Sequence, residues 1–146
     1  MSFKLTFPRA PRIQKAAKTA STAYAADIAV CPDADASGQA FTAATSSTIR
    51  IAGILQQVVA STDSDYATAG AKKNILIDED GEWTGDVGTG TADANDEQGY
   101  IDFKDEDELD VTASTTDAFY VTRYLSGTKV AGNFTGWAHR YSPAAD

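Results

Sequence analysis

Residues 118–137 read AFYVTRYLSGTKVAGNFTGW, and this stretch decides the fold class. Both halves of it are rich in aromatic and β-branched residues, which favour strands. Between the halves lies Ser126-Gly127-Thr128, a short polar segment with a central glycine that is typical of a hairpin connection. The sequence therefore predicts that residues 118–125 and 129–137 form a pair of antiparallel strands.

Shorter segments of the same character precede this pair at intervals of roughly ten residues. A β-rich run breaks at Gly53 as at a bulge, and Asp80-Gly81 is a strong hairpin signal between two later runs. Glycine and small polar residues at 85–99 predict a surface loop. Several short strands with little helical periodicity predict an all-β fold, a small antiparallel β-barrel or sandwich. The predicted strand segments in this part of the chain are 48–60, 74–77, 82–87 and 100–103.

Charge divides the chain unevenly. Five of the 12 Lys and Arg residues lie in the first 26 positions, where there is no acid, and all 21 Asp and Glu residues follow. This division predicts three parts. They are a basic N-terminal docking arm at 1–26, a connecting loop at 27–47 and the β-barrel or sandwich body at 48–146.

The arm is too polar and too rich in alanine to form a core of its own. Three apolar residues alternate with polar ones at its start and predict an extended segment with one apolar face. After Pro8 and Pro11, residues 13–24 show helical spacing, which predicts a short helix. We expect the arm to be ordered by a neighbouring molecule. The predicted contact residues are Phe3, Leu5, Phe7, Arg9, Arg12, Lys15 and Lys18.

Catalytic chemistry has few candidate groups in this sequence. His139 is the only histidine and Cys31 the only cysteine, so neither a Ser/His/Asp triad nor an ordinary zinc site is recognisable. The glycines of residues 85–90 are followed by no Lys-Ser/Thr pair and have acidic neighbours, unlike a phosphate-binding loop. The sequence therefore predicts a non-enzymatic protein without a cofactor.

One segment resembles the start of a calcium-binding loop. Asp33, Asp35 and Ser37 place oxygen atoms at alternate positions, and Gly38 occupies the sixth. Position twelve is Ala44, where such a loop needs a bidentate glutamate. The segment is therefore interpreted as an Asx-type turn, with a weak calcium site as the alternative.

The overall charge limits the possible partners. The net charge of −9 argues against binding of nucleic acid by the body, because a binding face must neutralise phosphates with Lys and Arg. No apolar run approaches the ~20 residues of a membrane helix. The acid-free N-terminus also resembles a transit peptide, although Pro8 and Pro11 interrupt any amphipathic helix there.

Several short motifs carry a resemblance to a known family. They are IAGILQ at 51–56, DYATAG at 65–70, GDVGTG at 85–90, LDVT at 109–112 and KVAGNF at 129–134. With these strand and turn motifs, residues 48–137 resemble the head decoration, or cement, proteins of tailed bacteriophages.

This resemblance implies a β-barrel or sandwich that binds the outer surface of the phage capsid in many copies and stabilises the head. The implied location is the virion, and the implied partner is the major capsid protein. Self-association as a closed trimer is expected, with a dimer as the alternative. Two other functions stay open. One is a tail, neck or fibre protein of the same particle, and the other is a secreted carbohydrate- or calcium-binding β module.

Overall fold

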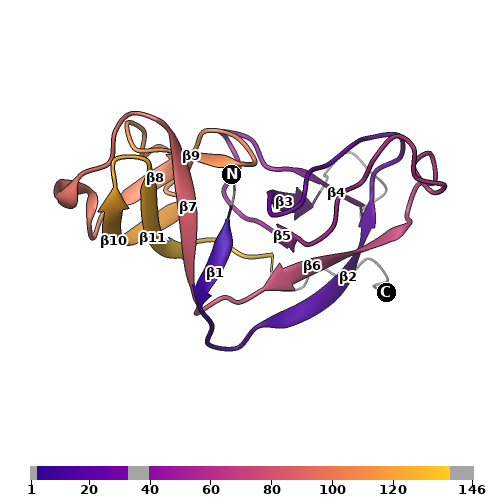
Figure 1. The fold of residues 1–146 in the computed structure, drawn as a ribbon, viewed down its shortest axis with the longest axis horizontal. Coiled ribbons are helices and arrows are strands. Elements are labelled where there is room, and N and C mark those ends of the chain that lie inside the picture. Colours follow the sequence, from indigo (N-terminus) through magenta and orange to yellow (C-terminus); the bar gives the residue numbers. More distant parts are fainter. Residues whose placement is uncertain (1–2, 33–39, 139–146) are drawn as a thin grey trace.

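The computed structural model describes residues 3–32 and 40–138, and its ribbon is drawn in Figure 1. Within these ranges the chain is built from β-strands and one short 3-10 turn, η1 (Ala94–Asp96), so the all-β prediction is confirmed. The strands are β1 (Lys4–Phe7), β2 (Arg12–Lys18), β3 (Ala29–Pro32), β4 (Ala40–Ala43), β5 (Gly53–Leu55), β6 (Lys72–Ile77), β7 (Glu82–Thr89), β8 (Tyr100–Phe103), β9 (Glu108–Asp110), β10 (Phe119–Ser126) and β11 (Lys129–Phe134).

The first barrel is a closed ring in the order β2-β4-β3-β5-β6. Strand β2 runs antiparallel to β6, with Arg12 opposite Ile77 and Ala17 opposite Lys72. The ring closes where the last residues of β2 pair in parallel with β4. Most other pairings of this barrel are antiparallel, as the sequence predicted.

The second sheet has the order β1-β7-β11-β10-β8-β9, and β9 also pairs with β7. These pairings return to β7, so this sheet also forms a ring. Thr84 of β7 pairs with both β1 and β11, and Asp86 pairs with both β11 and β9. Strands β1 and β9 therefore share one edge of β7, and β11 occupies the other. Figure 1 shows the two sheets side by side along the long axis of the molecule.

A single hydrophobic core runs through both barrels. At its centre the Phe134 ring lies 5.1 Å from the rings of Phe3 and Phe119 and 5.5 Å from that of Trp83. Edge contacts of this kind are favourable for aromatic rings beyond their burial of apolar area. Because Phe3 and Phe134 lie at opposite ends of the chain, the core depends on the N-terminal segment.

A glycine inside β7 makes room for one of these rings. A Cβ atom on Gly85 would lie 2.8 Å from Leu109 and 2.9 Å from the ring of Phe3. The strand predicted at 82–87 is confirmed as part of β7, which continues to Thr89, so the prediction of a surface loop across residues 85–99 is wrong for its first part. The glycine content that indicated a loop instead reflects close packing on a strand.

Two hairpin predictions have different outcomes. Strands β10 and β11 pair antiparallel, with Tyr120 opposite Asn133, so the hairpin at 118–137 is confirmed. Strands β6 and β7 do not pair with each other, so the hairpin predicted around Asp80-Gly81 is wrong. That turn instead carries the chain from the first barrel into the second. Strand β6 pairs with β2 and β5, and β7 pairs with β1, β11 and β9.

The predicted division of the chain also requires correction. Residues 3–26 are not a separate arm, because β1 belongs to the second sheet and β2 to the first barrel. Residues 12–18 form a strand and not part of a helix, and the connecting loop predicted at 27–47 contains β3 and β4. The physical reason is that strand partners lie far away in the sequence, where local charge and periodicity give no sign of them.

Candidate partner-binding surface

The seven residues predicted to contact a partner divide into two groups. Phe3 and Lys18 are buried, with 1% and 0% of their surface exposed, and Leu5 is half-buried against the core. These three residues therefore serve the fold, which corrects the prediction for Phe3 and Lys18. The four exposed members of the set are Phe7, Arg9, Arg12 and Lys15.

Lys18 holds one loop onto the first barrel. Its ammonium group donates to the backbone carbonyl oxygens of Tyr66 at 2.7 Å, Thr68 at 3.1 Å and Thr19 at 3.3 Å. A buried ammonium group is costly unless its hydrogen bonds are satisfied, and these three carbonyls satisfy them. The side chain is thus committed inside the chain and is not available to a partner.

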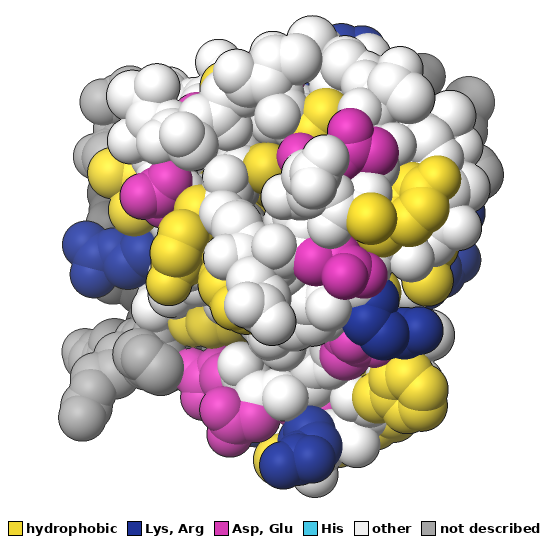
Figure 2. Space-filling model, turned by 90° about the vertical axis from the view of Figure 1, so that its left-hand side faces the viewer, with side chains coloured by type: hydrophobic (Ala, Val, Ile, Leu, Met, Phe, Trp, Pro, Cys, Tyr) yellow, Lys and Arg dark blue, Asp and Glu magenta, His cyan; other side chains and the backbone are white. Residues whose placement is uncertain are grey.

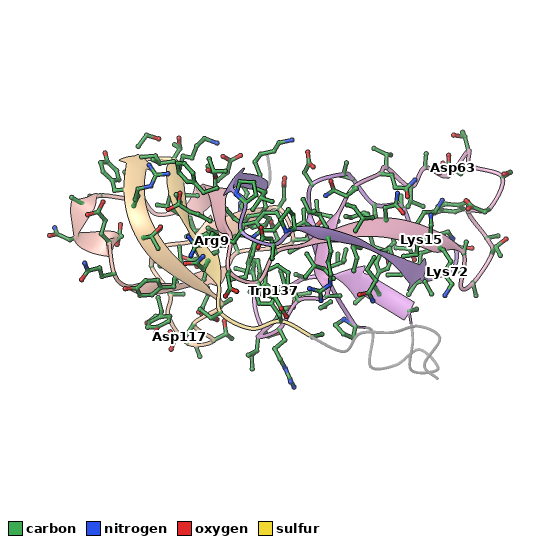
Figure 3. All side chains as sticks on the ribbon, turned by 90° about the horizontal axis from the view of Figure 1, so that it is seen from below. Arg9, Lys15, Asp63, Lys72, Asp117 and Trp137 are labelled. Carbon is green, nitrogen blue, oxygen red and sulfur yellow. The ribbon has the colours of Figure 1, made fainter. Side chains whose placement is uncertain are left out.

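Residues 7–13, which run from the end of β1 to the start of β2, are exposed throughout. This segment crosses from the second sheet to the first barrel at the lower edge of Figure 1. Phe7 and Ile13 have 57% and 55% of their surface exposed. Figure 3, seen from below, shows Arg9 near the middle of the molecule and Lys15 farther along β2. We define the bridge surface as Phe7, Arg9, Arg12, Ile13 and Lys15.

A buried carboxylate fixes the shape of this segment. Asp78 is fully buried and accepts hydrogen bonds from the backbone N–H of Arg9 at 2.8 Å and of Ala10 at 3.2 Å. A Cβ atom on Gly81 would lie 2.6 Å from the Asp78 carboxylate, so this turn needs glycine. The bridge surface is therefore pre-organised. Sequence reasoning missed Asp78, because an acid in a predicted turn gave no sign of burial.

Replacing Asp78 by alanine is expected to loosen the bridge. Two backbone N–H groups lose a carboxylate acceptor, and a hydrogen bond to a charged group contributes about 1.5–3 kcal/mol to the unfolding free energy. Urea denaturation should show this loss, and hydrogen exchange should accelerate at the amides of Arg9 and Ala10. Asp80→Ala is the matched control, because Asp80 lies in the same turn and is exposed. If both amides exchanged as slowly in the Asp78 variant as in the wild type, the structural role of this carboxylate would be contradicted.

The bridge surface itself carries three cations, and the neighbouring turn carries the acids Asp78, Glu79 and Asp80. Nη1 of Arg12 lies 3.9 Å from Oε1 of Glu79. Asp80 is exposed in the same turn as Glu79. No ion pair joins Arg9 or Lys15 to an acid among the described residues. Arg123, which is not part of the bridge surface, lies over the Phe7 ring, with its Cζ atom 5.4 Å from the ring centroid. The bridge surface is thus a cationic and apolar site on a chain whose net charge is −9.

Arg123 itself is committed to Glu82. Its guanidinium donates to the two carboxylate oxygens at 2.6 and 3.2 Å. This hydrogen bonding lowers the pKa of Glu82 and outweighs the opposite effect of burial. The pair therefore adds little net charge to the neighbourhood of Phe7.

A second buried carboxylate makes stability depend on pH. Burial tends to raise the pKa of Asp102, but hydrogen bonds from the backbone N–H groups of Thr115, Thr116 and Asp117 hold it below 3.8. A carboxyl whose pKa is lowered by folding stabilises the native state above its unfolded pKa. That stability is lost as the pH falls through the folded pKa.

Asp102→Asn should therefore lower the unfolding free energy at pH 7. The variant's unfolding free energy should also fall less steeply than that of the wild type as the pH drops below 5. Urea denaturation across this range measures both effects. Asp117→Asn is the control, because this exposed residue donates to Asp102 only through its backbone N–H. If the Asp102 variant kept the full acid dependence of the wild type, other carboxylates would account for it.

Other candidate sites give no comparable arrangement. Among residues 3–32 and 40–138, no group of three or more His, Cys, Asp or Glu side chains is placed to hold a metal ion. The calcium candidate Asp33, Asp35 and Ser37 lies outside the described residues. Figure 2, which views the second sheet end-on, shows hydrophobic side chains in separate patches among acidic and basic ones. The described ranges also contain no helix with the length and apolar character needed to cross a membrane.

Comparisons of the chain with protein-family models, curated proteins and solved structures found no match. A function for this protein therefore has to be argued from its own residues and geometry.

Proposed function

We propose that this protein is a non-enzymatic virion component that decorates the outer surface of a tailed-phage head and stabilises it. Its principal partner is the major capsid protein. The observation that carries the proposal is the bridge surface, where exposed Phe7 and Ile13 lie among cations on an otherwise acidic chain. The resemblance of the short strand and turn motifs in residues 48–137 to decoration proteins gives the proposal its context.

The rigidity of the bridge supports a binding role. Binding costs free energy for each flexible segment that becomes ordered, and Asp78 and two prolines have already ordered this one. Covering the exposed parts of Phe7 and Ile13 contributes on the order of 1 kcal/mol each. Such a contact is weak alone, but many copies on one lattice bind by avidity. The acidic remainder of the surface keeps a protein soluble at high local concentration.

Purified virions of the phage that encodes this chain test the proposal. Cryo-electron microscopy should show the double barrel at lattice points on the outside of the head, and mass spectrometry should find it in many copies per particle. Axial repetition along the tail would overturn the proposal in favour of a tail or neck protein. Absence from the virion would overturn both.

Substitutions test whether the bridge surface is needed for the protein to bind the head. Arg9→Glu combined with Arg12→Glu should reduce occupancy on the head, because it reverses the sign of the exposed charge. Arg50→Glu serves as the control, since Arg50 is an exposed cation outside the bridge. Unchanged occupancy of the double variant would contradict a binding role for this surface.

A further inference from the structure

We infer that one edge of β2 binds an extended, acidic segment of the capsid partner, which adds to the first barrel as a further strand. The inference rests on the proposed function and deepens it, because it names the form in which the partner meets the bridge surface. We define the free edge as the side of residues 12–15 that faces away from β6.

Strand β2 has a neighbouring strand along its whole length on one side only. On that side residues 12–17 pair with β6. On the other side β4 pairs with β2 at Ala17 and Lys18, and no strand of the described chain pairs with residues 12–15 there. Figure 1 places β2 at the lower edge of the molecule, so β2 lies on the near side of Figure 3, where Lys15 is labelled. An unpaired edge presents backbone donors and acceptors that another chain can use.

Hydrogen bonds on β6 show which backbone groups of β2 face outward. Asn74 lies opposite Lys15, but its N–H donates to Oε1 of Gln57 at 2.8 Å and its carbonyl accepts from the N–H of Gln56 at 2.9 Å. The backbone groups of Lys15 are therefore not bonded to Asn74. Because such groups alternate from side to side along a strand, the N–H and C=O groups of Ile13 and Lys15 both face away from β6. Within residues 3–32 and 40–138 nothing bonds to them.

The side chains on this edge favour an acidic partner. Ile13 and Lys15 are two residues apart on one exposed face of β2. The Lys15 ammonium group donates to the neutral amide oxygen of Asn74 at 3.2 Å, and no acid of the described ranges pairs with it. Opposite charges on neighbouring strands stabilise their pairing. The added strand therefore carries an acid opposite Lys15 and an apolar residue opposite Ile13.

A second copy of this chain is a poorer occupant of the edge. Two β2 edges side by side would bring Arg12 and Lys15 of both copies together, and like charges on paired strands repel. An acidic segment meets no such repulsion. It also meets a strand that Asp78 and β6 have already ordered, which lowers the cost of binding. Backbone hydrogen bonds then provide affinity, and alternate side chains provide specificity.

Hydrogen exchange at single amides tests the inference on the full-length protein. In the protein alone, the amides of Ile13 and Lys15 should exchange rapidly, whereas β6 protects those of Gln14 and Ala16. Binding to phage heads that lack this protein should slow exchange at Ile13 and Lys15 by at least about tenfold. Protection of both amides in the protein alone would mean that the chain covers its own edge. Rapid exchange in the head-bound protein would mean that the partner contacts side chains only. Either result would overturn the inference.

A proline substitution separates the backbone contact from the side-chain contact. Ile13→Pro removes the outward N–H and leaves the bonds to β6 in place, a change that edge strands tolerate. It should bind these heads about tenfold more weakly than Ile13→Ala, which keeps the N–H and loses the apolar side chain. Circular dichroism and thermal unfolding establish that both variants are folded. Equal affinities of two folded variants would count against an added strand.

A short synthetic peptide of alternating glutamate and valine distinguishes this inference from the proposed function. Titrated into the isotope-labelled protein, it should shift the amide resonances of Ile13 and Lys15, and a lysine–valine peptide should not. Equal shifts with both peptides would overturn the acidic preference and the inference with it. A protein that occupies heads while both amides exchange rapidly would overturn only this inference. A protein that binds the acidic peptide at these amides but is absent from the virion would overturn only the proposed function.

Discussion

A chain that lacks residues 1–18 is expected not to fold. The deletion removes β2, which pairs with both β6 and β4 and closes the first barrel. Without β2 this barrel opens. It removes β1 from the edge of β7 and Phe3 from the aromatic core. Small domains keep only about 5–15 kcal/mol of stability, and losing two strands and a buried ring exceeds that margin. Far-UV circular dichroism and urea denaturation should show loss of β structure and of a cooperative transition.

The matched control keeps the segment and removes only three of its exposed charges. A full-length protein with Arg9→Gln, Arg12→Gln and Lys15→Gln should fold with nearly wild-type stability, because surface substitutions usually change it by less than about 0.5 kcal/mol. A cooperative, native-like transition in the deleted chain would contradict the structure. It would favour an independent docking arm, as the charge division of the sequence predicted.

Phe3→Ala is expected to cost about 3–5 kcal/mol of unfolding free energy, the usual range for a buried phenylalanine. The Phe3 ring packs edge-on against Phe103 and Phe134, with centroids 5.9 and 5.1 Å away, and its removal leaves a cavity inside the second barrel. Urea denaturation at neutral pH measures this loss. The shift in the midpoint should occur with little change in the slope of the transition.

Phe7→Ala is the natural comparison, because both phenylalanines belong to the same predicted apolar stripe. Phe7 is more than half exposed and contacts Arg123, so its removal should cost less than about 1 kcal/mol of stability. Phe7→Ala should also weaken any contact that the bridge surface makes with a partner. Equal losses of stability in the two variants would mean that the stripe packs differently from the structure.

Some of the fold could be predicted from sequence because its signals are local. In residues 118–137 the strands and their turn are neighbours, so β-branched and aromatic residues and one glycine suffice to indicate β10 and β11. The strand at 100–103 was also predicted and is β8. Arg9, Arg12 and Lys15 are exposed on the surface of the chain, and their contact with a partner stays a prediction.

Other features depend on distant parts of the chain. Nothing near Asp78 indicates that its carboxylate receives the N–H groups of Arg9 and Ala10, which lie 69 and 68 residues away. Ile13 was assigned to a helix, and only its place on β2 shows that it is exposed beside the cations.

The amino-acid sequence alone determined the β character of the chain and the separation of its charges, because both follow from residue type and near neighbours. Only the tertiary structure decided where the basic N-terminal segment lies. Its strands pair with β6 and β7, and Phe3 and Lys18 become buried there. Burial of apolar area and completion of backbone hydrogen bonds outweigh the polar composition of the segment, and both depend on partners that the local sequence does not contain.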